Sequence, residues 1–206
     1  MRIGVVALQG AFEEHRILLE PLGVEVKKIR LPEDLFGCHG LILPGGETTA
    51  QRRLAVNYGL WKPIKEMARA GTPILGTCAG LILMARRIDG REGISLDVMD
   101  LDVQRNAYGR QIFSFETNLS VPPLENEFGG SPLFRAIFIR APRIVRVGAT
   151  VGVLASSQGE PVALQEGNLI GLCFHPELTR DDRFHRYFLN LAERASQPWS
   201  QPHLMI

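Results

Sequence analysis

The chain has 206 residues, of which 45% are hydrophobic and 22% are charged. At about 150 residues per domain, this length favours a single domain whose core needs no disulfide or metal. Lysine and arginine number 23, and aspartate and glutamate number 22. This balance argues against a protein dominated by nucleic-acid binding and excludes an acidic disordered tail. The three cysteines, Cys38, Cys78 and Cys173, form no CxxC pair, so neither a disulfide scaffold nor a zinc ribbon fits.

The first 86 residues alternate between strand and helix patterns. Short apolar runs predict strands at residues 3–8, 24–29, 41–43 and 73–76. Helical spacing predicts a helix from Phe12 to a stop at residues 21–23, one capped by Thr48 or Thr49 and running to Tyr58, and others at 60–70 and 79–86. This alternation is typical of a parallel sheet covered by helices.

The second half of the chain is rich in strand patterns. The predicted strands are at residues 96–104, 112–119, 135–139, 144–147, 151–156, 162–165 and 169–174. A helix follows at 182–194, and the proline-containing segment 196–206 is expected to be poorly ordered. We therefore predict an α/β fold with an open, mainly parallel sheet, helices on both faces and an antiparallel extension of the same sheet. Residues 1–195 are expected to form one domain.

No targeting segment is recognisable in the sequence. The apolar run near the start is too short for a signal peptide, and no run approaches the ~18 apolar residues of a membrane span. We expect a cytoplasmic protein.

The segment Gly76-Thr77-Cys78-Ala79-Gly80 carries the most informative motif. Its G-x-C-x-G spacing matches the nucleophile elbow, a tight turn that presents a side chain at the start of a helix. The helix dipole there favours a thiolate, and the amide of Ala79 is placed to receive an oxyanion. The alternative is a buried cysteine among small residues that let helix and sheet pack closely.

Two further strand ends carry groups that suit the same chemistry. His175 ends the last strand, and Glu177 is placed to orient it as a general base. Alone, such a pair is more often a surface hydrogen bond. Residues 44–49 read PGGETT, and their free amides suit an anion, although a plain turn with a helix cap explains the pattern too. In an open α/β sheet these strand ends meet at one edge.

The other cysteines carry less weight. Cys38 lies beside His39 in a predicted loop, but two ligands do not make a metal site. Cys173 lies inside an apolar strand and is expected to be a core residue. No metal and no cofactor is expected.

GTCAG together with FHPE resembles the class I, triad-type glutamine amidotransferases. More narrowly, IGVVALQGAFEEH, LILPGGETT, RNAYGRQ with SFE, FIRAP and FHPEL are similar to the family of glutaminase subunits of pyridoxal 5′-phosphate synthase. These blocks run from residue 3 to 178. Thr48 stands where the family commonly has serine, which keeps the hydroxyl. Residues 125–133 and the tail after Arg194 carry no motif of the family.

The resemblance implies that the protein hydrolyses L-glutamine to glutamate and ammonia and passes the ammonia to a separate synthase subunit, in a hetero-oligomeric complex that makes pyridoxal 5′-phosphate. It implies a catalytic triad of Cys78, His175 and Glu177, a thioester intermediate on the cysteine, and activation by the partner. The glutamine-binding residues that it implies are Gly46, Glu47, Thr48, Arg105, Ile139 and Arg140.

The residues suggest how the site would work. Backbone amides of Gly46 and Ala79 would hold the oxyanion, and Glu47 with Arg105 or Arg140 would pair the charged groups of glutamine. We hypothesise that a peptide at Gly45–Gly46 must reorient before its amide faces the oxyanion.

Three alternatives remain open at the level of sequence: a triad glutaminase that serves a different synthase, a cysteine hydrolase or peptidase on the same sheet, and a non-catalytic interaction subunit. RNAYGRQ and FIRAP argue against the first, and the intact Cys-His-Glu set argues against the last.

Overall fold

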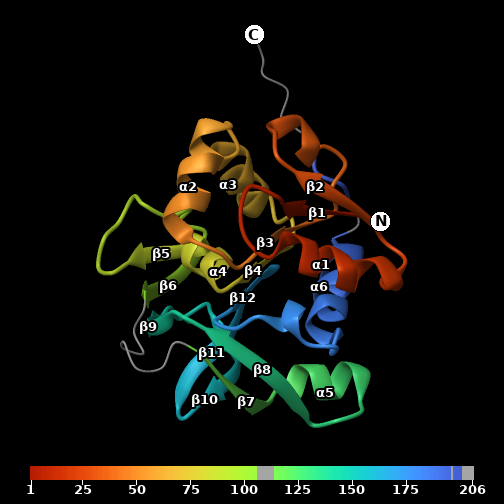
Figure 1. Cartoon of the computed structure of the whole chain (residues 1–206), viewed down its shortest axis with the longest axis vertical. Coiled ribbons are helices and arrows are strands. Elements are labelled where there is room, and N and C mark those ends of the chain that lie inside the picture. Colours follow the sequence, from red (N-terminus) through yellow and green to blue (C-terminus); the bar gives the residue numbers. More distant parts are fainter. Residues whose placement is uncertain (106–113, 196, 201–206) are drawn as a thin grey trace.

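A seven-stranded sheet runs through the middle of the molecule in this computed structural model, which describes residues 1–105, 114–195 and 197–200 (Figure 1). Its strands, in spatial order, are β10 (Gly152–Ser157), β11 (Glu160–Glu166), β12 (Leu169–Leu172), β4 (Ile74–Thr77), β3 (Gly40–Leu43), β1 (Arg2–Val6) and β2 (Glu25–Ile29). The five strands from β12 to β2 pair in parallel, and β11 and β10 continue the sheet in antiparallel fashion. The predicted parallel sheet with an antiparallel extension is confirmed at these strands.

Helices cover both faces of this sheet, as the alternating pattern predicts. They are α1 (Phe12–Leu19), α2 (Thr48–Asn57), α3 (Trp61–Arg69), α4 (Ala79–Met84), α5 (Pro122–Phe128) and α6 (Arg183–Arg194), with 3-10 turns η1 (Glu20–Leu22), η2 (Pro32–Leu35) and η3 (Pro176–Leu178). In Figure 1, α2, α3 and α4 lie on one side of the sheet, and α1 and α6 lie on the other. β3 and β4 are buried along their whole length because both of their faces are covered. No helix in the described part of the chain is long and apolar enough to cross a bilayer.

The other five strands of the described residues form two smaller sheets, which the sequence pattern did not separate from the main one. β5 (Ala85–Ile88), β6 (Met99–Gln104) and β9 (Arg143–Val147) form one, and β7 (Ser114–Ser120) and β8 (Leu133–Ile139) form the other. The expectation that the later strands extend the main sheet is therefore wrong for β6, β7, β8 and β9. No strand was expected at β5, which overlaps the end of the helix predicted at 79–86. Alternation along a strand shows which face is buried, but it does not show which neighbour pairs with the strand.

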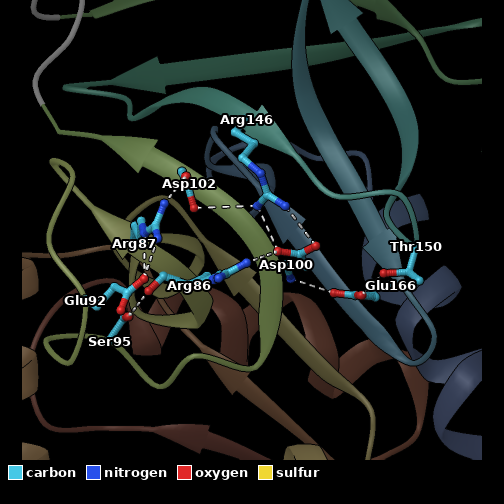
Figure 2. Close-up of polar contacts among 9 residues, drawn as sticks. All are labelled: Arg86, Arg87, Glu92, Ser95, Asp100, Asp102, Arg146, Thr150 and Glu166. Carbon is cyan, nitrogen blue, oxygen red and sulfur yellow. Dashed lines mark hydrogen bonds and ion pairs between the residues drawn. The ribbon is translucent and has the colours of Figure 1, made fainter.

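A network of ion pairs and hydrogen bonds joins the three-stranded sheet to the main sheet (Figure 2). The carboxylate of Asp100 on β6 accepts hydrogen bonds from Arg146 on β9, at 2.8 and 3.2 Å. The backbone N–H of Asp100 donates to Glu166 Oε2 on β11 at 2.8 Å, and Thr150 also bonds to this carboxylate. These contacts hold β6 in place, and β6 leads directly to Arg105.

Two predicted helix boundaries differ in the structure. The helix expected at 79–86 ends at Met84, because residues 85–88 pair with β6 instead of continuing the helix. The side chain of Glu47, instead of Thr48 or Thr49, caps α2, accepting hydrogen bonds from the amides of Thr49 and Ala50. Thr48 is already the first helical residue, so the N-cap position falls on Glu47. Helix α5 lies in the region to which the sequence assigned no structure.

The expectation of a poorly ordered tail does not hold at Trp199, although residue 196 and residues 201–206 lie outside the described part. The Trp199 side chain is 7% exposed and stacks on Phe36, with ring centroids 5.6 Å apart. Its backbone N–H donates to Cys38 O at 2.8 Å, and its carbonyl accepts from the N–H of Gly37 at 3.1 Å. A single aromatic residue in a proline-rich segment gives no periodic signal, so the sequence pattern did not reveal this anchor.

Replacing Trp199 with alanine should lower the free energy of unfolding by about 3 kcal/mol, because the substitution empties a buried aromatic site. Urea denaturation measures the loss. Tyr58→Ala removes an aromatic side chain that is 50% exposed, and it should change stability by only about 0.5 kcal/mol. Equal, small losses in both variants would mean that Trp199 does not pack against the body of the protein.

Candidate active site

The ends of four parallel strands meet at one edge of the central sheet. Residues 9–10 follow β1, residues 44–47 follow β3, Cys78 follows β4, and His175 lies three residues after β12. The arrangement follows from the parallel register, because parallel neighbours end on the same side. The structure therefore brings together the three strand ends that are predicted above to meet, at residues 44–49, 76–80 and 175–177, and adds the end of β1.

Cys78 lies in the turn between β4 and α4. Its φ of 47° and ψ of −100° fall in a region that residues other than glycine rarely adopt. A Cβ atom at Gly76 would lie 2.8 Å from the carbonyl carbon of Gly80, and a Cβ at Gly80 would lie 1.9 Å from Leu43 O. Both glycines are thus required for the close packing of helix on sheet. The turn is a strained elbow that places the thiol beside the start of α4.

His175 and Glu177 form a buried pair next to this thiol. His175 Nδ1 lies 2.7 Å from Glu177 Oε1, and the backbone N–H of His175 donates to Ile137 O at 2.8 Å. The Glu177 side chain is 0% exposed. Pro176 begins the short turn η3, which carries the carboxylate back toward the imidazole. The His-x-Glu spacing therefore produces the oriented imidazole that the sequence suggested.

The protonation of His175 depends on both of its partners. Burial by itself lowers the pKa of His175, but hydrogen bonds with Cys78 and Glu177 outweigh burial and raise this pKa to about 10. At pH 7 the imidazole therefore carries its proton beside the sulfur. A positive charge in this position favours the thiolate form of a cysteine.

The loop after β3 packs against the ring of His175. A Cβ at Gly45 would lie 2.3 Å from Cε1 of His175, so only glycine leaves room for the ring. The N–H of Gly45 donates to Thr77 Oγ1 at 3.0 Å, and its carbonyl accepts from the N–H of Ala11, also at 3.0 Å. The N–H of Glu47 donates to Gln9 Oε1 at 2.7 Å. The ends of β1, β3 and β4 are thereby tied to one another.

Two charged side chains of opposite sign face the same space. The hydrogen bonds from the amides of Thr49 and Ala50 outweigh burial and lower the pKa of Glu47, and the nearby Arg105 lowers it further. Glu47 is therefore an anion at neutral pH. Arg105 is held by Asp89, whose carboxylate accepts from the backbone N–H of Arg105 at 2.8 Å and from its Nε at 2.7 Å.

Ile139 and Arg140 approach from β8, on the opposite side of the thiol. Cys78 Sγ lies 3.8 Å from Ile139 O. Arg140 follows the end of β8 with a φ of 46°, and its side chain is exposed. A positive φ at a residue other than glycine is uncommon and accompanies the turn of the chain at this point.

A cavity of about 320 Å³ lies between these elements, and it is within the range of small-molecule sites. Its lining includes the predicted nucleophile, its histidine and all six of the residues proposed to bind substrate: Cys78, His175, Gly46, Glu47, Thr48, Arg105, Ile139 and Arg140. Glu177 is buried and contacts His175, which lies in the lining, by the hydrogen bond at Nδ1. Ala79 begins the helix beside the thiol.

Sequence reasoning missed several residues of this site. Gly10, Ala11, Ile82 and Leu178 also line the cavity. Gly10 adopts a φ of 102°, and a Cβ there would lie 1.9 Å from Gly45 O. The unusual end of the first strand was the available signal for Gly10 and Ala11, while Ile82 and Leu178 have no distinguishing signal.

The other two cysteines lie away from this chemistry. Cys38 and Cys173 are both buried in the hydrophobic core, as predicted for Cys173. Burial raises the pKa of the Cys38 thiol to about 11 and also raises that of Cys173. Within the described residues, no group of three His, Cys, Asp or Glu side chains is placed to hold a metal ion.

Known proteins resemble this chain over nearly its whole length. Residues 5–194 match the SNO glutamine amidotransferase family. Two relatives are named pyridoxal 5′-phosphate synthase subunit PdxT. The protein from Halalkalibacterium halodurans is 50% identical over 195 residues, which are 95% of this chain and 96% of the relative. The protein from Herpetosiphon aurantiacus is 51% identical over 195 residues, which are 93% of this chain and all of the relative.

A crystal structure of a glutamine amidotransferase has a TM-score of 0.86 and 44% sequence identity to this chain. The match covers 93% of this chain and 98% of that chain. The family match spans nearly the whole sequence and includes every element that forms the cavity. This chain belongs to the SNO glutamine amidotransferase family.

Proposed function

We propose that this chain is a glutaminase subunit, which hydrolyses L-glutamine to L-glutamate and ammonia and supplies the ammonia to a pyridoxal 5′-phosphate synthase subunit. The observation that carries the proposal is the hydrogen-bonded series of Cys78, His175 and Glu177 at a cavity with Glu47 and Arg105 in its wall. The names of the relatives are the reason for proposing a pyridoxal 5′-phosphate synthase subunit as the acceptor of the ammonia.

The first half-reaction uses the thiolate of Cys78. The sulfur attacks the side-chain amide carbon of glutamine, and the electron pair of the carbonyl moves to oxygen. Backbone amides of Gly46 and Ala79 hold this oxyanion, and each contributes about 3–4 kcal/mol to lowering the barrier. The C–N bond then breaks, and ammonia leaves with the proton of His175. A γ-glutamyl thioester remains on the cysteine.

The second half-reaction releases glutamate. His175, now neutral, takes a proton from a water molecule, and the resulting hydroxide attacks the thioester carbon. The C–S bond breaks, which returns the thiolate and the protonated imidazole. Throughout, Glu177 holds the Nδ1–H of His175, so that Nε2 stays directed at the reacting atoms.

The wall of the cavity suits the charged end of the substrate. The carboxylate of Glu47 pairs with the α-ammonium group, and Arg105 or Arg140 pairs with the α-carboxylate. Gly46, Thr48 and Ile139 complete the contacts around the ligand. Asp89 holds Arg105 through Nε and thereby orients the guanidinium. This contact does not use the two terminal nitrogens, which can pair with the substrate carboxylate.

The loop at Gly45 offers a route to control by the partner. The carbonyl of Gly45 and the N–H of Gly46 belong to one peptide unit, and the carbonyl is bonded to Ala11. Reorienting this peptide therefore requires breaking that hydrogen bond, a net cost of about 1 kcal/mol. We propose that the synthase subunit stabilises the reoriented form in a hetero-oligomeric complex. We also propose that residues 1–195 work as one catalytic domain and that the reaction takes place in the cytoplasm, where the three free cysteines stay reduced.

Ammonia release from glutamine, measured with and without the cognate synthase subunit, tests the proposed function. The synthase should stimulate release, and Cys78→Ala should abolish release while leaving synthase binding intact. Cys38→Ala is the matched control and should keep its activity, because Cys38 lies in the core away from the cavity. Hydrolysis that persists in Cys78→Ala would refute the nucleophile. Turnover of a γ-glutamyl peptide without any partner would favour a peptidase, and stimulation by a different synthase would favour another glutaminase.

Alkylation by iodoacetamide at pH 7 should modify Cys78 and spare the other two cysteines. Cys78 faces the cavity beside a protonated imidazole, whereas burial raises the thiol pKa of Cys38 to about 11 and keeps Cys173 protonated as well. A thiol with a raised pKa holds its proton until the pH approaches that pKa. Raising the pH to 8 should therefore not make either of these two thiols reactive. Peptide mass mapping identifies the modified residue, and 6 M urea should make all three reactive. Modification of Cys38 ahead of Cys78 in the native protein would contradict the assignment.

Gly45→Ala should lower kcat by about 100-fold or more, because the new methyl group displaces the His175 ring. Gly152→Ala is the matched control. A Cβ at Gly152 meets only Gln165 O, at 3.6 Å, so its kcat should stay within about twofold of the wild type. Both are measured by ammonia release with the synthase present. A wild-type kcat for Gly45→Ala would show that the loop does not constrain the histidine.

A further inference from the structure

His15 is a buried histidine on α1 that the proposed reaction does not use. Its side chain is fully buried, and it contacts three polar groups from three other parts of the chain. His15 Nδ1 lies 2.9 Å from His185 Nε2 on α6. His15 Nε2 lies 3.2 Å from Thr77 Oγ1 at the end of β4 and 3.5 Å from Glu177 Oε2 in η3. The imidazole therefore lies directly behind the proposed triad.

The carboxylate of Glu177 has one oxygen that the triad leaves unpaired. Oε1 is bonded to His175, whereas Oε2 is buried and has no hydrogen-bond partner among the described residues. A buried carboxylate oxygen without a donor is costly. A donor toward Oε2 would offset this cost and fix the orientation in which Oε1 meets His175. The Nε2 atom of His15 faces this oxygen.

A neutral His15 ring carries its proton on either Nδ1 or Nε2, and only an Nε2–H can donate a hydrogen bond to Glu177. Burial, followed by the charges of His185 and His175, holds the pKa of His15 well below its ordinary value, so the ring is neutral and carries one N–H. Burial also lowers the pKa of His185, to about 4, so that ring is neutral as well. The titratable groups that face His15 are thus His185 on α6 and Glu177 in η3.

Two arrangements of these protons are available. If Nδ1 of His15 carried the hydrogen, it would donate to His185 Nε2, and the hydrogen of His185 would lie on Nδ1, which is buried without a partner among the described residues. The lone pair of His15 Nε2 would then face the Glu177 carboxylate. If Nε2 carries the hydrogen, it points toward Glu177 Oε2 and Thr77 Oγ1, and His185 Nε2–H donates to His15 Nδ1. The second arrangement leaves no buried N–H of the pair unpaired and removes the lone-pair repulsion.

Thr77 extends the influence of His15 to the other side of the site. Its hydroxyl oxygen accepts from the N–H of Gly45 at 3.0 Å, and Gly45 in turn packs against the ring of His175. One buried donor thus contacts both the acid of the triad and the side chain that anchors the glycine loop.

We propose that His15, as a neutral Nε2–H donor, is a positioning residue that holds the Glu177 carboxylate oriented toward His175. The inference rests on the proposed roles of Cys78, His175 and Glu177. Without this donor, Glu177 Oε2 is unpaired, the carboxylate holds the His175 imidazole less firmly, and Cys78 loses reactivity at neutral pH.

Two amide substitutions separate the two nitrogens of His15. The amide nitrogen of glutamine reaches the place of Nε2, so His15→Gln keeps a donor toward Glu177. The shorter asparagine reaches only the place of Nδ1, so His15→Asn keeps a group beside His185 and loses the donor. The readouts are kcat and KM for ammonia release with the synthase, the pH profile of Cys78 alkylation by iodoacetamide, and the thermal midpoint of unfolding.

His15→Asn should lower kcat by about 10- to 100-fold with KM within about twofold, which is the loss of one hydrogen bond to a charged group. Its alkylation profile should move up by about one pH unit, and His15→Gln should recover both properties to within about threefold. In a Glu177→Gln background, His15→Asn should have no further effect on kcat. The proposal would be overturned if both His15 variants lost kcat equally and in proportion to the drop in their thermal midpoints, while their alkylation profiles stayed unchanged.

The wild-type protein provides a test that needs no variant to fold. Nitrogen-15 NMR of the imidazoles at pH 7 should show His15 protonated on Nε2 and bare on Nδ1. Protonation on Nδ1 would overturn the inference while leaving the triad intact. A wild type that releases no ammonia with the synthase and does not react at Cys78 would instead refute the proposed function.

Discussion

The hydrogen bond between His175 Nδ1 and Glu177 Oε1 places a carboxylate inside the hydrophobic core, and much of the site depends on it. A buried carboxylate is stable only with hydrogen-bond donors and a positive partner. His175 supplies both, and the charge of Glu177 in turn keeps the imidazole protonated beside Cys78. The two residues are separated by one proline, so local backbone geometry sets their distance. The rest of the site must bring a thiol and a substrate to this pair.

Close approach of backbone segments achieves this. Gly10, Gly45 and Gly80 each lie where a side chain would collide with a neighbouring backbone segment or with the ring of His175. The strand ends can therefore touch, and hydrogen bonds from Gly45 to Ala11 and Thr77 hold them together. The cost is a strained turn at Cys78, and the surrounding packing maintains this strain. The same strain keeps the thiol directed at the cavity.

The smaller sheets supply further residues of the cavity lining. Arg105 follows β6, and the ion-pair network around Asp100 joins β6 to the main sheet. Ile139 and Arg140 follow β8, which belongs to a separate two-stranded sheet. Cys78, His175 and Glu47 thus lie at the ends of the parallel strands, whereas Arg105, Ile139 and Arg140 reach the cavity from the smaller sheets.

Local pattern by itself determined the alternating parallel core, the elbow at Cys78 and the His-x-Glu pair, because each depends on residues close together in the sequence. The tertiary structure decided the division into three sheets, the cap of α2 by Glu47 and the anchoring of Trp199, because strand partners and contacts of single side chains leave no periodic signal. It also decided the role of His15. A histidine on a helix pattern looks like any other, and only the fold places its imidazole between His185, Thr77 and the free oxygen of Glu177. Chemistry that depends on residues close together in the sequence can be predicted from the sequence. Contacts such as that of His15 with His185, which are 170 residues apart, require the structure.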